Sequence, residues 1–315
     1  MSVISLGENI YQVDVNYRGE PERTSCYIIL AEKAAIFETG ATPGIGRLVE
    51  ALKDLGVSPG QLAYIIVSHI HLDHAGGAGA LIREFPDARV VVHPRGARHL
   101  VEPSRLINAA RQLYGASFDV LFGDIYPVPE ERVHTPEEGE TLDLGSGRML
   151  SIYHTPGHAR HHMVLYDPAS RGIFSGDCLG GHYPLLSRLI GRPYVLPITP
   201  PSEFDPAAFM ETFDRLNRLD LEDVYFTHFG KVAGASGIIA RNRELVRVYA
   251  ETGRHMLAAG GGVKDIEEAL WSMLWGELSQ YGEFKQEQSI TELLASDMGL
   301  NAGGIANYFE RMKKR

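Results

Sequence analysis

The sequence is poor in cysteine and contains no long apolar run. Cys26 and Cys178 are its two cysteines among 315 residues, too few for a disulfide framework or a cysteine-rich zinc module. No segment approaches the roughly 20 apolar residues that span a bilayer, and residues 1–9 lack the basic start and apolar stretch of a signal peptide. These absences predict a cytoplasmic protein with no membrane partner.

Concentrated positive charge is also missing. The formal net charge is −10, with 40 acidic side chains against 30 lysines and arginines, whereas a nucleic-acid groove requires a clustered basic surface. The composition, 44% hydrophobic and 22% charged, is that of an ordinary globular protein. The charge balance therefore excludes nucleic acid as a partner and favours a small-molecule substrate.

Short apolar runs alternate with helical patterns through residues 1–240, which we interpret as one α/β catalytic domain. The run 62–68 is typical of a buried strand that ends at His69, and residues 96–114 form a helical insertion. The other predicted strands are 10–17, 25–30, 34–38, 89–93, 148–153, 163–166, 172–175 and 223–227, and the other predicted helices are 44–55, 75–84 and 206–219.

Residues 241–315 are predicted to form a helical C-terminal extension. Helical patterns cover 237–258, 264–274, 289–295 and 302–313, and the glycines at 260–262 mark a break. Apolar positions such as Leu270 and Trp271 allow these helices to pack within the chain or to form a homodimer contact.

Four potential metal ligands follow the buried strand within six residues: His69, His71, Asp73 and His74. In an extended segment alternate side chains face the same way, so His69 and His71 can converge on one ion. Asp73 and His74 can face a second ion as the chain turns into a helix. Imidazole and carboxylate ligands suit zinc, and also iron or manganese.

Three later turns each carry one more candidate ligand. Thr155-Pro156-Gly157-His158, Ser175-Gly176-Asp177 and Thr227-His228-Phe229-Gly230 each follow a β-like run. A Gly-His or Gly-Asp pair alone is typical of an ordinary turn. Their order after the histidine cluster is the informative feature.

In this order the motifs resemble those of the metallo-β-lactamase superfamily, over about residues 10 to 235. The resemblance implies an αββα sandwich of two β-sheets between helices, with two divalent metal ions, zinc foremost, at one edge. It places His69, His71 and His158 on the first ion and Asp73, His74 and His228 on the second. Asp177 would bridge the ions together with a hydroxide. One departure is Glu38-Thr39-Gly40, where Asp-Thr-Gly is usual.

Three side chains are candidates for catalysis beyond metal binding. Asp73 can accept a proton and pass it to the leaving group. The resemblance gives His162 a supporting role beside the ligands, and Tyr183 is a hypothetical donor to a developing oxyanion. For His154, His161 and His182 the sequence leaves two interpretations open, polar loop residues or contacts with the site.

The full ligand set favours a hydrolase that cleaves a small ester, thioester or lactone. A phosphodiesterase uses the same two-metal chemistry and is the first alternative. Iron redox chemistry on the same fold is another, although His71 stands where flavo-diiron proteins have Glu. A non-catalytic scaffold is the last, and it conflicts with the retention of every ligand.

Overall fold

The computed structural model describes residues 3–314 and divides into two compact units. Unit 1 comprises the chain up to Thr155 together with His161–Gly176 and Asp220–Ala235. Unit 2 comprises Pro156–Arg160, Asp177–Leu219 and the chain from Ser236 onward. The chain thus passes between the units several times, and the candidate ligands are distributed over both.

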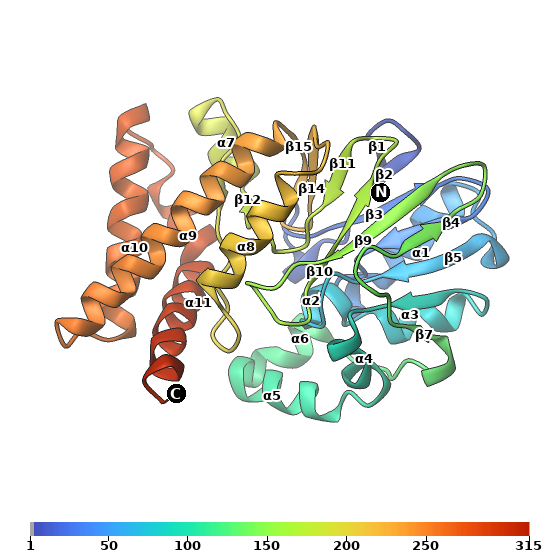
Figure 1. Cartoon of the computed structure of the whole chain (residues 1–315), viewed down its shortest axis with the longest axis horizontal. Helices are drawn as coiled ribbons and strands as arrows, with labels where there is room; N and C mark the ends of the chain where they lie inside the picture. The colour runs from blue at the N-terminus through green and yellow to red at the C-terminus, as the bar shows by residue number, and fades with distance from the viewer. Residues whose placement is uncertain (1–2, 315) are drawn as a thin grey trace. The chain divides into compact units, whose positions relative to one another are not determined.

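Unit 1 contains two β-sheets (Figure 1). The first is a 7-stranded sheet in chain order, with antiparallel pairs from β1 to β4 and parallel pairs from β4 to β7. Its strands are β1 (Val3–Ser5), β2 (Ile10–Asp14), β3 (Ser25–Leu30), β4 (Ala34–Phe37), β5 (Leu62–Ile66), β6 (Arg89–Val91) and β7 (Val133–His134).

The second sheet has 6 strands in the order β15-β14-β11-β10-β9-β8, of which β11 and β14 are parallel and the other pairs antiparallel. The strands are β8 (Thr141–Asp143), β9 (Met149–His154), β10 (Met163–Asp167), β11 (Gly172–Phe174), β14 (Asp223–Phe226) and β15 (Gly230–Ala233). Strands β14 and β15 flank His228, so this sheet carries a candidate ligand at its end.

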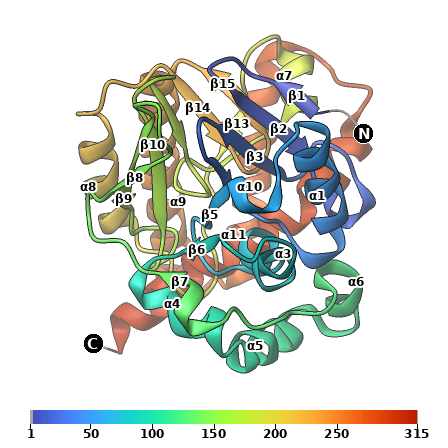
Figure 2. The ribbon, with the colours of Figure 1, turned by 90° about the vertical axis from the view of Figure 1, so that its right-hand side faces the viewer.

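The alternation of side chains along β3 explains the layers of unit 1. Ile28 is buried among residues of the helices α1 (Ile45–Asp54) and α3 (Ala78–Glu84). Its neighbours Tyr27 and Ile29 are buried against residues of the second sheet such as Phe174. Helices α1 and α3 lie on the same side of the first sheet (Figure 2). Unit 1 therefore packs a helical layer on the first sheet and the first sheet on the second.

Helices of unit 1 follow three strands of the first sheet, β4, β5 and β6. The predicted insertion is present as three helices, α4 to α6, and starts slightly earlier than expected. The helices of this unit are α1 (Ile45–Asp54), α2 (Leu72–Ala75), α3 (Ala78–Glu84), α4 (Pro94–Val101), α5 (Ser104–Tyr114) and α6 (Phe118–Phe122), with short 3-10 turns at Tyr17–Gly19, Thr42–Gly44, Pro59–Gln61, Gly115–Ser117 and Glu130–Arg132.

Unit 2 is mainly helical, with one small two-stranded sheet. Asp205 caps its helix α8 by accepting hydrogen bonds from the backbone amides of Ala207 and Ala208, at 3.1 and 3.2 Å. The elements are β12 (Gly181–His182), α7 (Pro184–Ile190), β13 (Val195–Leu196), α8 (Pro206–Leu216), α9 (Ala235–Ala258), α10 (Val263–Leu278), a 3-10 turn at Ser279–Tyr281, and α11 (Glu287–Lys313). The expected mixed α/β fold with a C-terminal helical region is confirmed.

One sequence prediction in this region is wrong. Residues 289–295 and 302–313 were expected as separate helices, but α11 continues without a break through residues 296–301 between them. A Cβ atom at Gly304 would lie 2.0 Å from the carbonyl oxygen of Thr199. The side chain of Asn301 also accepts from the Thr199 amide at 2.7 Å and donates to the Pro197 carbonyl at 3.0 Å. Small residues here permit close packing rather than ending the helix.

No helix within residues 3–314 combines the length and the apolar character that crossing a bilayer requires.

Candidate metal centre

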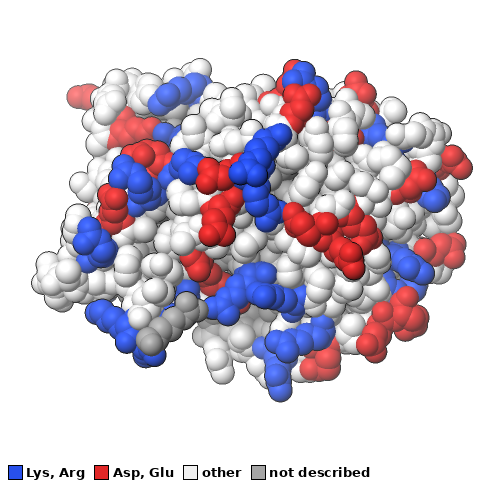
Figure 3. All heavy atoms as spheres, in the orientation of Figure 1, with Lys and Arg blue, Asp and Glu red and all other residues white. Residues whose placement is uncertain are grey.

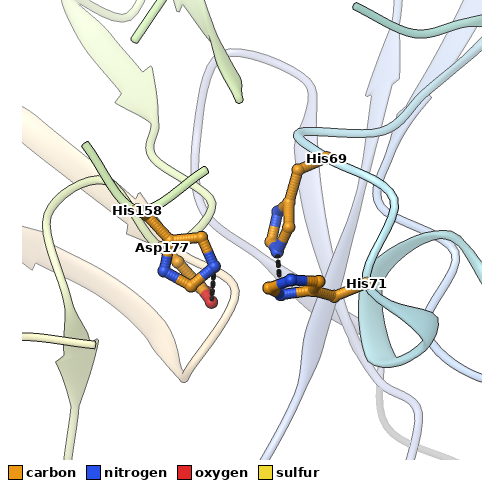
Figure 4. Close-up of side chains that lie close together, drawn as sticks. All are labelled: His69, His71, His158 and Asp177. Carbon is orange, nitrogen blue, oxygen red and sulfur yellow. Dashed lines mark hydrogen bonds and ion pairs between the residues drawn. The ribbon is translucent and has the colours of Figure 1, made fainter. Parts of the chain in front are cut away.

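The histidine cluster lies where β5 ends and α2 begins, as the sequence predicts. His71 is the extended residue before the first turn of α2, and His69 is completely buried. The Nε2 atom of His69 and the Nδ1 atom of His71 lie 2.8 Å apart (Figure 4). The alternate side chains of this extended segment therefore converge, as two ligands of one ion must.

Asp73, His74 and His228 form a candidate metal site entirely within unit 1. The Nε2 atoms of the two histidines lie 3.3 Å apart, and Oδ2 of Asp73 lies 3.8 Å from that of His74 and 3.6 Å from that of His228. The carboxylate of Asp73 and the imidazole of His74, both from α2, thus meet the imidazole of His228 from the β14–β15 connection. This ligand set suits a divalent transition metal.

The Nδ1 atoms of His74 and His228, on the side of each ring away from Asp73, are held by hydrogen bonds. Nδ1 of His228 donates to the backbone carbonyl of Arg23 at 2.9 Å, and Nδ1 of His74 lies 2.9 Å from a carboxylate oxygen of Glu38. A proton on Nδ1 leaves the lone pair on Nε2, which is the atom that faces Asp73. The residues present therefore fit a metal ion, because their ligand atoms point to one position.

His158 and Asp177 lie together in unit 2. Nε2 of His158 is 3.3 Å from Oδ2 of Asp177 (Figure 4), and its Nδ1 donates to the carbonyl of Ile198 at 3.0 Å. Gly157, directly before this histidine, has φ +144° and lies so close to Phe209 that a Cβ atom would be 2.5 Å from the ring. The turn that presents His158 therefore needs glycine. His158 and Asp177 together offer one nitrogen and one oxygen ligand.

His162 lies within unit 1 beside the first of the ligands. Its ring centroid is 5.1 Å from that of His69, and its Nδ1 atom is 2.7 Å from the hydroxyl oxygen of Thr155. The side chain is completely buried. The supporting role that the resemblance implies for His162 stays a prediction.

Tyr183 lies in unit 2, directly before α7, and is 6% exposed. Its hydroxyl donates to Oδ2 of Asp297 at 2.8 Å. A phenol has one proton, so donation to a substrate requires an exchange of partner. The catalytic role of Tyr183 stays a prediction.

The three histidines with open roles differ in their surroundings. His154 packs its ring 4.3 Å from that of His93, and burial followed by the charges of His154 and His161 lowers the pKa of His93 to about 4. His161 stacks 6.2 Å from His69. His182, in unit 2, lies 2.8 Å from the hydroxyl oxygen of Ser187. His161 is therefore the extra histidine that the structure places beside a ligand within unit 1.

Sequence reasoning missed Tyr17 as a neighbour of the site. Its side chain packs in a cluster with Leu72 and Phe122. Burial and then the negative charge of Asp73 raise the pKa of the Tyr17 phenol. Only the spatial approach of the β2–β3 connection to α2 reveals this contact, because Tyr17 belongs to no motif.

The model of the Metallo-beta-lactamase superfamily matches residues 19–228 of this chain. A metallo-beta-lactamase fold-containing protein of Sulfurisphaera tokodaii is 30% identical over 217 residues, which is 68% of this chain and 75% of that protein. An anaerobic nitric oxide reductase flavorubredoxin of Klebsiella pneumoniae is 27% identical over 158 residues, which is 50% of this chain. The chain spans only 28% of that reductase.

Two solved structures share the fold. An archaeal metallo-beta-lactamase superfamily protein from Sulfolobus tokodaii aligns with a TM-score of 0.61 and 26% identity, over 75% of this chain and 85% of its own. A metallo-beta-lactamase family protein from Thermus thermophilus aligns with a TM-score of 0.63 and 20% identity, over 98% of this chain and 95% of its own. The second likeness covers the C-terminal helices as well, and at that identity it concerns the fold alone.

Proposed function

The chain belongs to the metallo-beta-lactamase superfamily, and from this premise we propose that it is a dinuclear metal-dependent hydrolase of small esters, thioesters or lactones. The observation that supports this most directly is the convergence of Asp73, His74 and His228, with the outer nitrogen of each histidine already held. A site built from neutral imidazoles and one carboxylate binds a cation in the way that hydrolases of this type require.

We further propose that the pair His69 and His71 of unit 1 and the pair His158 and Asp177 of unit 2 hold the first ion together, with Asp177 shared between both ions. Two bound divalent ions would supply hydroxide at neutral pH and polarise the carbonyl oxygen of the substrate. Zinc is the first choice for this mixed nitrogen and oxygen set, and iron and manganese are the alternatives.

The protein's own residues would then move the proton. The Asp73 carboxylate has two oxygens, so one can bind an ion while the other accepts a proton and passes it to the leaving group. Oδ2 of Asp73 lies 3.8 Å from Nε2 of His74 and 3.6 Å from Nε2 of His228, which supports a shared place for this carboxylate and the two imidazoles. His162, through its contact with Thr155, would hold the ring of His69 in place.

The surface charge agrees with a small-molecule substrate rather than a nucleic acid. On the face drawn in Figure 3, acidic and basic side chains are interspersed. From the low cysteine content we also propose that the protein works in the cytoplasm. Leu270 of α10 is buried within the chain, whereas Trp271 is partly exposed, and we propose that such partly exposed positions form a homodimer contact.

Metal analysis tests the proposal first. Protein purified without added metal and then incubated with Zn²⁺ should retain two ions per chain after desalting. His228→Ala should retain fewer, whereas His255→Ala, an exposed histidine on α9, should behave as the wild type. One ion or fewer per wild-type chain would contradict the dinuclear proposal.

A substrate panel then distinguishes the reaction classes. We expect turnover of p-nitrophenyl esters, homoserine lactones or S-lactoylglutathione, and none of bis-p-nitrophenyl phosphate. Turnover of the phosphodiester alone would favour the phosphodiesterase alternative. The partial similarity to nitric oxide reductases makes iron redox chemistry the second candidate, which reduction of nitric oxide or oxygen by the iron-loaded protein would support.

A further inference from the structure

Glu38 is a buried carboxylate at the end of β4, in the segment that departs from the usual Asp-Thr-Gly of the family. It is completely buried, and its φ of 68° lies in the left-handed region. A non-glycine residue in that region is strained, and the surrounding structure must offset the cost. The backbone amide of Glu38 donates to the Ile66 carbonyl at 2.8 Å, so the strained residue is fixed against the strand that leads to His69.

The Glu38 carboxylate binds three segments that carry candidate ligands. It accepts from the backbone amide and the hydroxyl of Ser68, the residue before His69. It also faces Nδ1 of His74 at 2.9 Å and accepts from the hydroxyl of Thr227 at 3.2 Å. Thr227 directly precedes His228, and it is separated from Glu38 by 189 residues of chain.

The direction of these hydrogen bonds determines which ring nitrogen carries the proton in two candidate ligands. The Ser68 hydroxyl has one proton, which it donates to Glu38, so it can only accept from Nδ1 of His69, 2.9 Å away. His74 donates its Nδ1 proton to Glu38 directly. Both imidazoles therefore carry their proton on Nδ1 and keep the Nε2 lone pair for an ion.

His69 and His74 belong to different metal positions. The single negative charge of Glu38 thus acts on one ligand of each position, directly on His74 and through Ser68 on His69. A carboxylate that accepts from a ligating imidazole makes that ligand more basic and fixes its ring. One buried side chain can therefore strengthen binding at both positions together.

We propose that Glu38 is a positioning residue that couples the two metal positions, an inference that rests on the proposed dinuclear function. Loss of its charge weakens binding of both ions, because His74 and the Ser68–His69 pair lose the same acceptor. Loss of the Ser68 hydroxyl weakens chiefly the ion at His69, because its oxygen lies 2.9 Å from Nδ1 of His69 and 3.5 Å from Nδ1 of His74. The longer side chain of Glu compared with Asp is needed to reach Ser68, His74 and Thr227 at once.

The test measures the binding of two Co²⁺ ions by visible absorption, with full-length wild type and the variants Glu38→Gln, Glu38→Asp and Ser68→Ala. We expect Glu38→Gln to weaken both binding steps by about 10- to 100-fold. Glu38→Asp keeps the charge on a shorter side chain, so both steps should be weaker than in the wild type and stronger than in Glu38→Gln. Ser68→Ala should weaken one step and leave the other within about threefold. The matched control is Thr141→Val, an exposed threonine of β8, which should change each step by less than threefold.

The outcomes separate this inference from the proposed function. A wild-type chain that binds only one Co²⁺ ion overturns both. Two ions in the wild type, with a Glu38→Gln effect confined to one step or absent, overturn only the coupling. Thermal unfolding of each metal-free variant shows whether it folds.

A second measurement needs no variant. Nitrogen-15 NMR of the metal-free wild type should show the Nδ1-protonated tautomer for both His69 and His74. An Nε2-protonated tautomer at either residue overturns the proposal, so an unfolded Glu38→Gln variant would not leave it undecided.

Discussion

The hydroxyl of Tyr27 in the first sheet donates to the backbone carbonyl of Phe226 in the second sheet, at 2.5 Å. Phe226 ends β14, two residues before His228, so this bond fixes the second sheet at the metal centre. The Ser25 amide adds a second link, because it donates to the Thr227 carbonyl at 2.8 Å. The position of the last ligand is therefore set by the first sheet as much as by its own strand.

Tyr27→Phe removes the hydroxyl and leaves the Phe226 carbonyl buried without that donor. We expect the free energy of unfolding to fall by about 1–3 kcal/mol, as measured by urea denaturation of the metal-free protein. Tyr166→Phe is the control, because its hydroxyl bonds to the Asp220 carbonyl at an exposed site and its loss should cost less than about 0.5 kcal/mol. Equal losses in the two variants would contradict the role given to Tyr27.

The ligand cluster could be predicted from the sequence because its spacing is local. Four candidate ligands lie within six residues after an apolar run. This spacing predicts both their place at the end of a strand and the shared direction of alternate side chains. The family and its mixed α/β fold followed from the order of the later motifs, and both are confirmed. The domain boundary at residue 240 and the catalytic roles of Asp73, His162 and Tyr183 stay predictions.

The features of the fold and of the site that the sequence did not predict depend on contacts between residues far apart in the chain. Glu38 meets Thr227 across 189 residues and Tyr27 meets Phe226 across 199, and no spacing rule contains such pairs. The break predicted at residues 296–301 was wrong because this part of α11 packs against Thr199, through the hydrogen bond of Asn301 and the close approach of Gly304. Glycine both weakens a helix and permits close approach to a neighbour, and only the position of Thr199 shows that the second applies.

Gly176, between β11 and Asp177, is the glycine on which the site depends most directly within unit 1. It has φ +50°, and a Cβ atom there would lie 2.5 Å from Cβ of Ser68 and 2.6 Å from Nε2 of His162. Gly176→Ala should therefore displace both residues, lower the free energy of unfolding by about 1–3 kcal/mol and reduce zinc content. Gly191→Ala is the control, since its φ of +72° is similar but its surroundings are open. Zinc content that stays normal in Gly176→Ala would contradict this account.

Metal removal should destabilise the protein. An ion that binds the folded chain stabilises it by about 2.7 kcal/mol at a free concentration 100 times the dissociation constant. We expect the unfolding temperature to fall when a chelator strips the protein and to recover with added Zn²⁺. His228→Ala should show a smaller rise on zinc addition than His255→Ala. The same rise in both variants would show that zinc acts elsewhere.

Glu277 in α10 should make the stability of unit 2 depend on pH. Arg241 donates two hydrogen bonds to its carboxylate, at 2.9 and 3.0 Å, and the Tyr194 hydroxyl donates a third at 2.8 Å. Burial raises the pKa of Glu277, but the hydrogen bonds and charge of Arg241 outweigh it, so the pKa is lowered. The folded state thus binds its proton less readily than the unfolded state.

A lowered pKa gives stability that is present above the unfolded value of 4.5 and is lost as the pH falls through the folded value. Glu277→Gln should therefore be less stable than the wild type by about 1–3 kcal/mol at pH 7, and the difference should shrink below pH 4.5. Urea denaturation at several pH values measures it. A difference that stays constant with pH would contradict the charge interaction.

Tyr183 offers a test of the hypothetical oxyanion donor. If its phenol leaves Asp297 to donate to the substrate, Tyr183→Phe should lower kcat by about 100-fold, as the loss of one oxyanion donor does. Asp297→Asn removes the charge of the resting partner but keeps the phenol, so it should leave kcat within a few fold. Tyr183→Phe loses the hydrogen bond to Asp297 in the free enzyme, and urea denaturation should show a loss of about 1–3 kcal/mol. Asp297→Asn keeps an uncharged acceptor oxygen for the phenol, so its loss should be smaller. Stability losses without any change in kcat would make the Tyr183–Asp297 bond a structural link of unit 2 and remove Tyr183 from the catalytic residues.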